Sequence, residues 1–409
     1  MRFKLVLTLL AATIGSLLGV GCGSGSDPNT IRIVSSLPRT GSAKKQTDTM
    51  VNGIKMALEE AGWKIGDFKL DFQDWDDATA SAGEATADME QRNAQRAAGD
   101  SNVMVYLGPY NSGVAKISMP ILNRAGLLMI SPANTATGLT KPGKGGPQEP
   151  QCYRPSGKIT YTRVVPADDL QGSRSAEFCQ NLGIQRVYIL DDKTAYGQGI
   201  ADIFEQRCKE LNIKVLGHDN IDSHATEFKS LMTSIKDLNP DLVYFGGTTQ
   251  TKGGQLAKDL VASGSTAKMM VPDGCFEEAF ILAAGAENLN DRCYVTFGGL
   301  PPDKLEGNGK AFVEKYKAKY QVEPEAYAVY GYEAGQVAVE AIRRAGKKDR
   351  AAIVEACLAI RDFDGALGKW SFDANGDTTL TTITVNLIKG GKFTFYELLN
   401  ATAAGAAAK

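Results

Sequence analysis

The sequence predicts an α/β fold of two lobes, each built on a parallel β-sheet with helices on both faces. Short apolar runs rich in β-branched residues alternate with amphipathic helical stretches, which is the pattern of a parallel sheet. About 380 residues follow the first apolar segment, more than one hydrophobic core usually spans. The strand–helix alternation runs through two successive series, so we expect two similar, Rossmann-like lobes.

The first series ends near Ser131. We expect strands at 31–35, 69–72, 103–107 and 127–131, and helices at 48–60, 80–97 and 113–124. In the helix 48–60, Met50, Ile54 and Leu58 fall on one face, as in a helix that packs on a sheet.

The second series follows residues 141–151, a stretch rich in glycine and proline that is typical of a surface loop. We expect extended segments at 158–165, 186–190, 214–218, 242–245, 268–271 and 293–297, and helices at 170–182, 197–211, 227–237 and 253–263. Three more helices (310–320, 326–345 and 348–360) precede strands within 368–395, and the low-complexity end is expected to fray.

The amino terminus has the order of an export signal. A positive start at Arg2 and Lys4 precedes an apolar run, and small residues lead to Cys22. This resembles a bacterial lipoprotein signal, although Gly19 stands where the usual pattern has leucine. We expect a signal peptide at 1–21, lipidation of Cys22 and a flexible tether at 22–30; the alternative is an ordinary signal that is cut nearby. Either way the mature protein is exported to the cell envelope, and with lipid at Cys22 it is anchored to a membrane that it does not span.

Bulk composition excludes several classes of protein. The chain is 43% hydrophobic and 22% charged, as in a soluble globular protein, and its net charge of −2 gives no general attraction to nucleic acid. No later apolar run approaches the length of a membrane helix.

Beyond Cys22 there are six cysteines: Cys152, Cys179, Cys208, Cys275, Cys293 and Cys357.

Disulfide pairing stays open at this point. Cys275 follows one expected strand and Cys293 begins the next, so a parallel sheet would place them at opposite edges. Cys179 and Cys208 fall late in consecutive helices and could lie at similar height. The alternative is that most of these cysteines are small buried apolar residues.

Motifs for catalysis, cofactors and metals are not found. There is no Walker-type phosphate loop or GxSxG elbow, and Gly197-Gln-Gly199 lacks the third glycine of a dinucleotide fingerprint. The only histidines, His218 and His224, suit no helix face, and Asp373–Asp377 reads better as a β-turn than as a calcium loop. We expect no enzyme activity, no cofactor and no metal.

Two turns at strand ends point to a binding site. The strand 103–107 runs into Gly108–Gly113, and the strand 127–131 runs into Ser131-Pro-Ala-Asn-Thr135. Ligands of open α/β sheets bind outside such carboxyl ends. Hydroxyl groups and helix-start N–H groups suit a carboxylate. The alternative is that Ser112 and Thr135 only cap helices.

At these residues the chain resembles the extracytoplasmic solute-binding proteins of ABC transporters for branched-chain amino acids, which have the type I periplasmic binding protein fold. The resemblance covers about Ile31 to Leu398. Besides the two turns above, it includes Thr40-Gly-Ser, Asn52–Glu60, Asp191–Gly197, Val243–Gly247 and Tyr330–Ala334. It implies two lobes joined by a three-strand hinge. Lobe 1 would comprise 30–164 and 299–366, lobe 2 would comprise 165–297 and 370–398, and 399–409 would be a frayed tail.

The resemblance also implies a ligand site on lobe 1. Ser112 matches the serine that binds the ligand carboxylate, Thr135 matches a threonine that holds carboxylate and ammonium, and Ala133 offers backbone groups. Tyr327 matches an aromatic wall of the side-chain pocket; the alternative is a helix-core residue.

On lobe 2, Tyr196 matches an aromatic of the family's Asp-x-x-x-Tyr-Gly turn, and Asp273 matches an acidic partner of the α-ammonium. A desolvated ammonium needs such a paired charge. The alternatives are a packed loop aromatic for Tyr196 and a turn former for Asp273.

Two departures from the family bear on specificity. Thr248 and Thr249 stand where many relatives have an aromatic residue, and we expect Thr248 to line the site. Lys44, Lys45 and Gln46 stand where relatives have a tyrosine near the ligand. The side-chain pocket is therefore expected to be more polar or larger than one for leucine.

The implied function is the substrate-binding component of an ABC importer, which captures an amino acid-like solute, branched-chain type first, and delivers it to a membrane permease. We expect a monomer. The alternative is a sensory receptor for amides, urea or aromatic acids that feeds a signalling partner. An enzyme with the same fold would need a nucleophile–base pair or a metal in its cleft.

Overall fold

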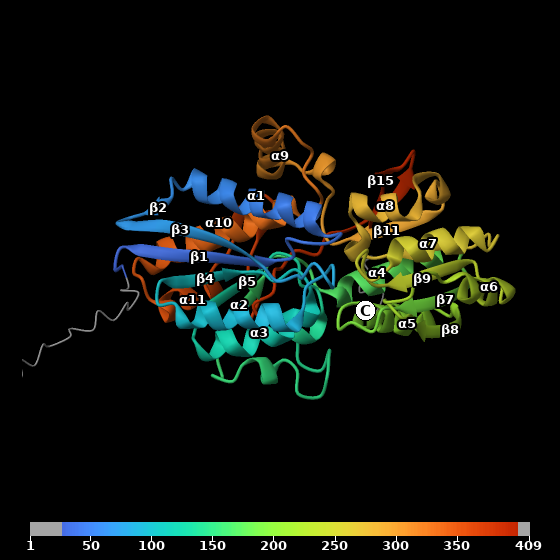
Figure 1. Ribbon diagram of the computed structural model, residues 1–409, viewed down its shortest axis with the longest axis horizontal. Coiled ribbons are helices and arrows are strands. Elements are labelled where there is room, and N and C mark those ends of the chain that lie inside the picture. The colour runs from blue at the N-terminus through green and yellow to red at the C-terminus, as the bar shows by residue number, and fades with distance from the viewer. Residues whose placement is uncertain (1–26, 400–409) are drawn as a thin grey trace, which may run out of the picture.

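The computed structural model describes residues 27–399 and contains two large β-sheets with helices on both faces (Figure 1). The expected α/β fold with parallel sheets is confirmed. The expected signal peptide 1–21, Cys22 and all but the first residue of the expected tail 399–409 lie outside the described residues. That first residue, Leu399, pairs with Ile383 and belongs to the last strand.

The first sheet has the strand order β2-β3-β1-β4-β5-β6 and is parallel except for the short pair β2–β3. Its strands are β1 Thr30–Leu37, β2 Lys64–Ile65, β3 Phe68–Asp76, β4 Val103–Leu107, β5 Leu128–Ser131 and β6 Tyr161–Arg163. The helices α1 Lys44–Glu60, α2 Ala87–Gly99 and α3 Ser112–Arg124 follow its strands.

Three helices from late in the chain complete this lobe: α9 Gly307–Tyr320, α10 Ala328–Ala345 and α11 Arg350–Leu358. α10 packs along α1, and α11 lies under β4 and β5 (Figure 1). Glycines allow the close crossing of α1 and α10, since a Cβ atom on Gly53 would lie 2.4 Å from the Ala328 carbonyl oxygen. Segments far apart in sequence thus share one core.

The second sheet has the order β15-β14-β11-β10-β9-β7-β8. Its strands are β7 Arg186–Asp191, β8 Lys214–Asn220, β9 Leu242–Gly246, β10 Lys268–Val271, β11 Cys293–Phe297, β14 Ile383–Lys389 and β15 Lys392–Leu399, the last two antiparallel. Its helices are α4 Asp168–Asn181, α5 Gly197–Glu210, α6 Lys229–Asp237, α7 Gly253–Ala262 and α8 Glu278–Ala284. A small hairpin pairs β12 Phe363–Gly365 with β13 Gly368–Trp370.

The helix expected at 80–97 is wrong at its start, because α2 begins only at Ala87. The Thr86 side chain accepts a hydrogen bond from the Met89 N–H and caps the helix. Gly83 has a φ of +70°, a conformation that ends helical backbone, and Ala85 bridges to Ala78. Residues 79–86 therefore form a loop, and this loop reaches the cavity described below.

The lobe ranges implied by the resemblance put the third crossover between the lobes near 364–369, but the contacts of residues 370–377 favour a later position. The Trp370 indole donates to Glu333 of α10 at 2.6 Å, and the Asp377 carboxylate accepts from Arg163 of β6 at 2.7 Å. Both contacts tie residues 370–377 to the first lobe. We propose that this crossover falls at about 380–382, directly before β14, and that the first two lie after β6 and after β11.

The pairing of Cys179 with Cys208 is wrong: all six cysteines in the described part of the chain are free thiols, and only Cys152 is exposed. Cys179 and Cys208 lie in the apolar core between α4, α5 and the second sheet, where the Cys179 sulfur faces that of Met270 at 4.0 Å. Burial raises the pKa of Cys208 to about 12. Cys179 and Cys208 pack as small apolar side chains, which was the alternative to a disulfide in the sequence analysis.

Candidate ligand-binding site

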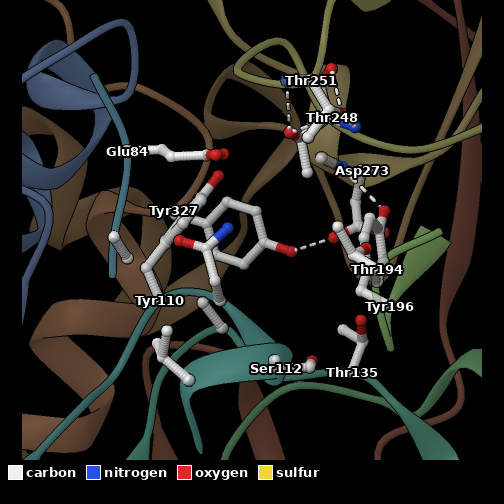
Figure 2. Close-up of a pocket in the computed structure, with 16 residues that line it drawn as sticks. Glu84, Tyr110, Ser112, Thr135, Thr194, Tyr196, Thr248, Thr251, Asp273 and Tyr327 are labelled. Atoms are coloured by element: carbon white, nitrogen blue, oxygen red, sulfur yellow. Dashed lines mark hydrogen bonds between the residues drawn. The ribbon is translucent and has the colours of Figure 1, made fainter. Parts of the chain in front are cut away.

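A cavity of about 160 Å³ lies between the lobes, at the carboxyl ends of strands of both sheets (Figure 2). It is smaller than the roughly 300–1,000 Å³ of pockets for drug-sized ligands, so it suits a molecule of amino-acid size. Its lining residues are Glu84, Ala85, Tyr110, Asn111, Ser112, Gly113, Val114, Ala133, Thr135, Thr194, Tyr196, Thr248, Thr251, Asp273, Gly274 and Tyr327.

The first lobe presents hydrogen-bonding groups to this cavity from two adjacent strand ends. Ser112 is the first residue of α3, and its hydroxyl accepts from the Ala136 N–H at 3.3 Å. Ala133 and Thr135 follow β5 and are buried. The unpaired N–H groups and the dipole at the start of α3 favour an anion here. This end of the cavity suits a carboxylate.

The second lobe presents the Asp273 carboxylate, which directly follows β10 and Pro272. Three donors hold it. Tyr196 Oη donates to Oδ1 at 2.8 Å and Tyr327 Oη donates to Oδ2 at 2.5 Å (Figure 2). Gln171 Nε2 also donates to Oδ1, at 2.9 Å. Tyr196 also accepts from the Gly274 N–H at 3.0 Å. These bonds fix the orientation of a carboxylate that is only 4% exposed.

Burial dominates the electrostatics of this cluster. It raises the pKa of Asp273, although the three donors oppose the shift. Burial and the neighbouring Asp273 raise the pKa values of Tyr196 and Tyr327 well above their ordinary range, so both phenols stay protonated and donate. No cationic side chain contacts Asp273 in the described residues, so a ligand ammonium would supply the charge that it lacks.

Threonines from two turns of the second lobe form the remaining wall. Thr251 Oγ1 donates to Asp192 at 2.7 Å and lies 3.1 Å from Thr248 Oγ1. Thr194 Oγ1 donates to the other oxygen of Asp192 at 2.7 Å. Asp192, which is 5% exposed, therefore orders three hydroxyl groups that face the cavity.

The seven residues that the sequence analysis assigned to ligand binding all line this one cavity: Ser112, Ala133, Thr135, Tyr196, Thr248, Asp273 and Tyr327. Their roles toward a ligand stay predictions. Asp273 also begins a 3₁₀ turn, and Tyr327 also packs its ring on Tyr110 and Phe297, so the alternative roles coexist with the position in the site.

Lys44, Lys45 and Gln46, which follow the Thr40-Gly-Ser turn and were expected to alter the side-chain pocket, do not line the cavity. Lys44 pairs with Asp48, and Lys45 pairs with Glu278 and Glu325. Gln46 donates to the Phe276 carbonyl at 3.2 Å and accepts from the Tyr327 N–H at 3.1 Å. Thr249 also stays outside the lining.

Sequence reasoning missed several lining residues, above all Glu84. The signal for it was the pair Gly83 and Thr86, which breaks the expected helix and turns Glu84 into a loop residue. Thr194 lies within the Asp191–Gly197 turn, and Thr251 lies three residues after Thr248. For Thr194 and Thr251, the presence of hydroxyl side chains in turns near the assigned residues was the sequence feature that could have indicated a place in the site.

A possible metal-ligand group lies away from this cavity. Ligand atoms of Asp202, Glu205 and His218 lie within 4.8 Å of one another. However, the His218 ring nitrogens contact Glu205 at 2.9 Å and Asp191 at 3.0 Å, and these two carboxylates raise the pKa of His218 to about 9. At neutral pH the ring is protonated and donates to both carboxylates, so it has no lone pair for a metal.

Comparison with known proteins identifies the family. The family model described as periplasmic binding protein matches residues 30–392, so this chain belongs to that family. The expected family is confirmed, and it is a family of solute-binding proteins and not of enzymes. Among residues 27–399, no helix is both long and apolar enough to cross a membrane.

Similar proteins carry names that refer to amino acids. An amino acid binding protein of Pseudomonas aeruginosa is 27% identical over 380 residues, 92% of this chain and 94% of that protein. Leu/Ile/Val-binding protein homolog 2 of Brucella abortus is 28% identical over 391 residues, 93% of this chain and 96% of that protein. The crystal structure of the leucine binding protein LivK of Thermotoga maritima matches with a TM-score of 0.78 and 26% identity, and the match covers 90% of this chain and 99% of that one.

Proposed function

We propose that this protein is the substrate-binding component of an ABC importer, and that it binds an α-amino acid or a close analogue between its lobes. The observation that carries the proposal is the buried Asp273 carboxylate, which has no cationic partner among residues 27–399 and shares a cavity with Ser112 and the start of α3. A zwitterion matches both ends of that cavity. The relatives' names make branched-chain amino acids the reference ligands.

The binding cycle follows from the two lobes. An open form takes up the ligand through its carboxylate on lobe 1, and rotation about the three connections brings Asp273 onto the ammonium. The closed form is held by contacts such as the bond from Tyr327 of α10 to Asp273, and it is the form offered to the permease. The cavity binds and releases its ligand without any bond being made or broken.

The proposed cellular setting follows the same assignment. Export by the signal 1–21 and lipid on Cys22 would hold the protein, as a monomer, on the membrane that contains its permease. The names of the relatives refer to amino acids, which favours an amino acid over amides, urea or aromatic acids as the ligand. Mass spectrometry of the protein purified from membranes tests lipidation, since a free, uncut or differently cut amino terminus contradicts it.

Thermal unfolding with a panel of α-amino acids tests the function. A ligand present at about 1,000 times its Kd adds about 4 kcal/mol to the free energy of unfolding, which raises Tm measurably. We expect at least one α-amino acid to do this at submillimolar concentration. The matching amine without carboxylate and acid without amine should fail. If no α-amino acid shifts Tm even at 10 mM, a ligand level about tenfold above a weak, millimolar Kd, the proposal is wrong.

A further inference from the structure

The charges around the cavity are unbalanced. Two of its sixteen lining residues, Glu84 and Asp273, are acidic, and none is a lysine, arginine or histidine. A zwitterionic amino acid brings one ammonium, which Asp273 can bind, and one carboxylate, which the neutral donors of lobe 1 can bind. Glu84 would then face the ligand without a partner. Burying a carboxylate costs free energy unless a cation or a hydrogen-bond donor compensates it, and a cationic ligand would do so for the half-buried Glu84.

Glu84 is placed for contact with the ligand itself. It lies in the loop 79–86, between Gly83 and the bridge from Ala85 to Ala78, and its carboxylate extends toward the interior of the cavity (Figure 2). Within residues 27–399, this carboxylate takes part in no hydrogen bond or ion pair. Loop geometry alone therefore does not explain an acidic side chain at this position.

The charged groups around Glu84 come from the second lobe. Burial, and after it the charge of Asp192, raise the pKa of Glu84, whereas the charges of His224 and Lys252 oppose this shift. Of these two residues, Lys252 is the permanent cation that could compete with a ligand for Glu84. It stands just before α7 and does not line the cavity.

The threonines beside Glu84 offer acceptors and not donors. Thr194 and Thr251 use their hydroxyl hydrogens on Asp192. Since the hydrogen of Thr251 is committed, Thr248 is the donor in the 3.1 Å contact between their hydroxyl oxygens. Thr251 Oγ1 accepts from the Thr248 N–H at 2.9 Å as well as from Thr248 Oγ1, so it has no lone pair left for a ligand. Thr194 Oγ1 accepts from the Gly197 N–H at 2.9 Å, and Thr248 Oγ1 accepts from the Thr251 N–H at 3.2 Å, which leaves each of these two oxygens one lone pair for the cavity. This wall suits N–H groups and is a poor surface for an aliphatic chain.

We infer that the side-chain end of the cavity selects an amino acid whose side chain ends in a cationic N–H group, an ammonium or a guanidinium, with Glu84 as its counter-ion. The inference rests on the proposed function and narrows its ligand class. Glu84 binds the far end of the ligand, the threonine oxygens of Thr194 and Thr248 accept further N–H bonds, and Asp273 keeps the α-ammonium.

Matched ligand pairs test the inference by isothermal titration calorimetry at low salt. Lysine and norleucine differ only in the terminal ammonium, and arginine and citrulline differ in charge at nearly constant shape. We expect the cationic member of at least one pair to bind at least about tenfold tighter. Glu84→Gln should remove that preference by weakening the cationic ligand about tenfold, and should leave norleucine within about threefold.

Two control variants define the outcome. Glu314→Gln makes the same chemical change on the exposed face of α9 and should alter nothing. Lys252→Gln should leave the preference in place. If norleucine or leucine binds as tightly as lysine in the natural protein, or if Glu84→Gln leaves the preference intact, the inference is overturned. Tight binding of leucine that depends on Asp273 would overturn the inference about cationic side chains but leave the proposed function standing. If no amino acid in the panel binds, the proposed function itself is overturned.

Discussion

At the scale of single residues, Asp273 shows how a carboxylate is prepared for a cation. Two tyrosines and Gln171 hold it by hydrogen bonds that oppose the rise in its pKa caused by burial. None of these donors carries a positive charge, so they orient the carboxylate without neutralising it. A ligand ammonium would therefore make a short, directed hydrogen bond to Asp273. It would also supply the positive charge that the buried carboxylate lacks.

Asp273→Asn tests this role. We expect the affinity for the α-amino acid to fall by about 2–4 kcal/mol, because the ligand ammonium would lose its buried partner charge. Titration calorimetry measures the change. Asp237→Asn, at the exposed end of α6, is the matched control and should bind like the natural protein. Equal affinities of Asp273→Asn and this control would show that Asp273 is not the ammonium ligand.

His218 gives a second prediction, on stability. Its folded pKa of about 9 lies above the ordinary value of 6.5, mainly because Asp191 and Glu205 bind the protonated ring. This stabilisation is complete below pH 6.5 and is lost as the pH rises through 9. His218→Gln should lower the free energy of unfolding by roughly 1–2 kcal/mol at pH 6, allowing for the partial exposure of the ring.

Chemical denaturation at pH 6 and pH 10 measures that pH dependence. The difference between His218→Gln and the natural protein should shrink at pH 10, where the ring is neutral in both the folded and the unfolded chain. A difference that stays constant would show that His218 acts through packing alone. His224, which is exposed on the surface, serves as the control histidine.

At the scale of elements, the buried pair of Arg163 and Asp377 ties a late segment to the first sheet. Arg163 is fully buried and donates to Asp377 at 2.7 Å, and also to the carbonyl oxygens of Asn134 at 3.2 Å and Ala136 at 2.9 Å. Those carbonyls flank Thr135 of the cavity. The Arg163 guanidinium therefore holds two segments in place: the segment around Asp377, and the loop after β5 that carries Thr135.

Asp377→Asn should destabilise the protein by about 3–5 kcal/mol, since it leaves the guanidinium buried without a counter-charge. Ligand affinity should fall as well, because Arg163 positions the loop that carries Thr135. Denaturant unfolding and calorimetry on the same variant separate the two effects. A variant as stable as Asp237→Asn would contradict the role given to this pair.

At the scale of the whole molecule, closure of the two lobes depends on contacts that cross the cavity. Tyr327 of α10 donates to Asp273, and Gln46 of α1 donates to the carbonyl of Phe276 at 3.2 Å. Outside the cavity, Lys141 pairs with Asp169 of α4 at 2.8 Å, and Lys45 pairs with Glu278 of α8. Ion pairs in contact with solvent, such as the exposed pair of Lys45 and Glu278 and the half-buried pair of Lys141 and Asp169, contribute little. The buried bonds are therefore the ones that bias closure.

Tyr327→Phe keeps the ring and removes the bond between the lobes. A hydrogen bond to a charged group contributes about 1.5–3 kcal/mol, so affinity should fall by about tenfold or more. Small-angle X-ray scattering should show a smaller decrease in radius of gyration on ligand addition. Tyr316→Phe removes a hydroxyl that bonds only within the first lobe, to Asn52 at 3.1 Å, and should change neither quantity. If both variants behave alike, closure does not depend on Tyr327.

The sequence predicted most elements because their apolar periodicity is local. It failed where a distant contact or a cap decides. The helix at 80–97 lost its first turns to Gly83 and the Thr86 cap, and we propose a later last crossover because Trp370 and Asp377 bond to residues far away in the chain. Cys179 and Cys208 are free thiols that pack in one apolar core, a distinction that their sequence spacing could not make.

By itself, then, the sequence determined the alternation of strands and helices and placed Ser112 and Thr135 at neighbouring strand ends, since strand-end turns in a parallel sheet gather at one edge. The family resemblance supplied the other five residues assigned to the cavity. Only the tertiary structure decided what surrounds them. It brought Tyr327 from the far end of the chain onto Asp273, committed the threonine hydrogens to Asp192, and turned Glu84 inward. Charge balance and hydrogen-bond direction in a cavity depend on neighbours that the chain order does not reveal, and these two properties decide which ligand fits.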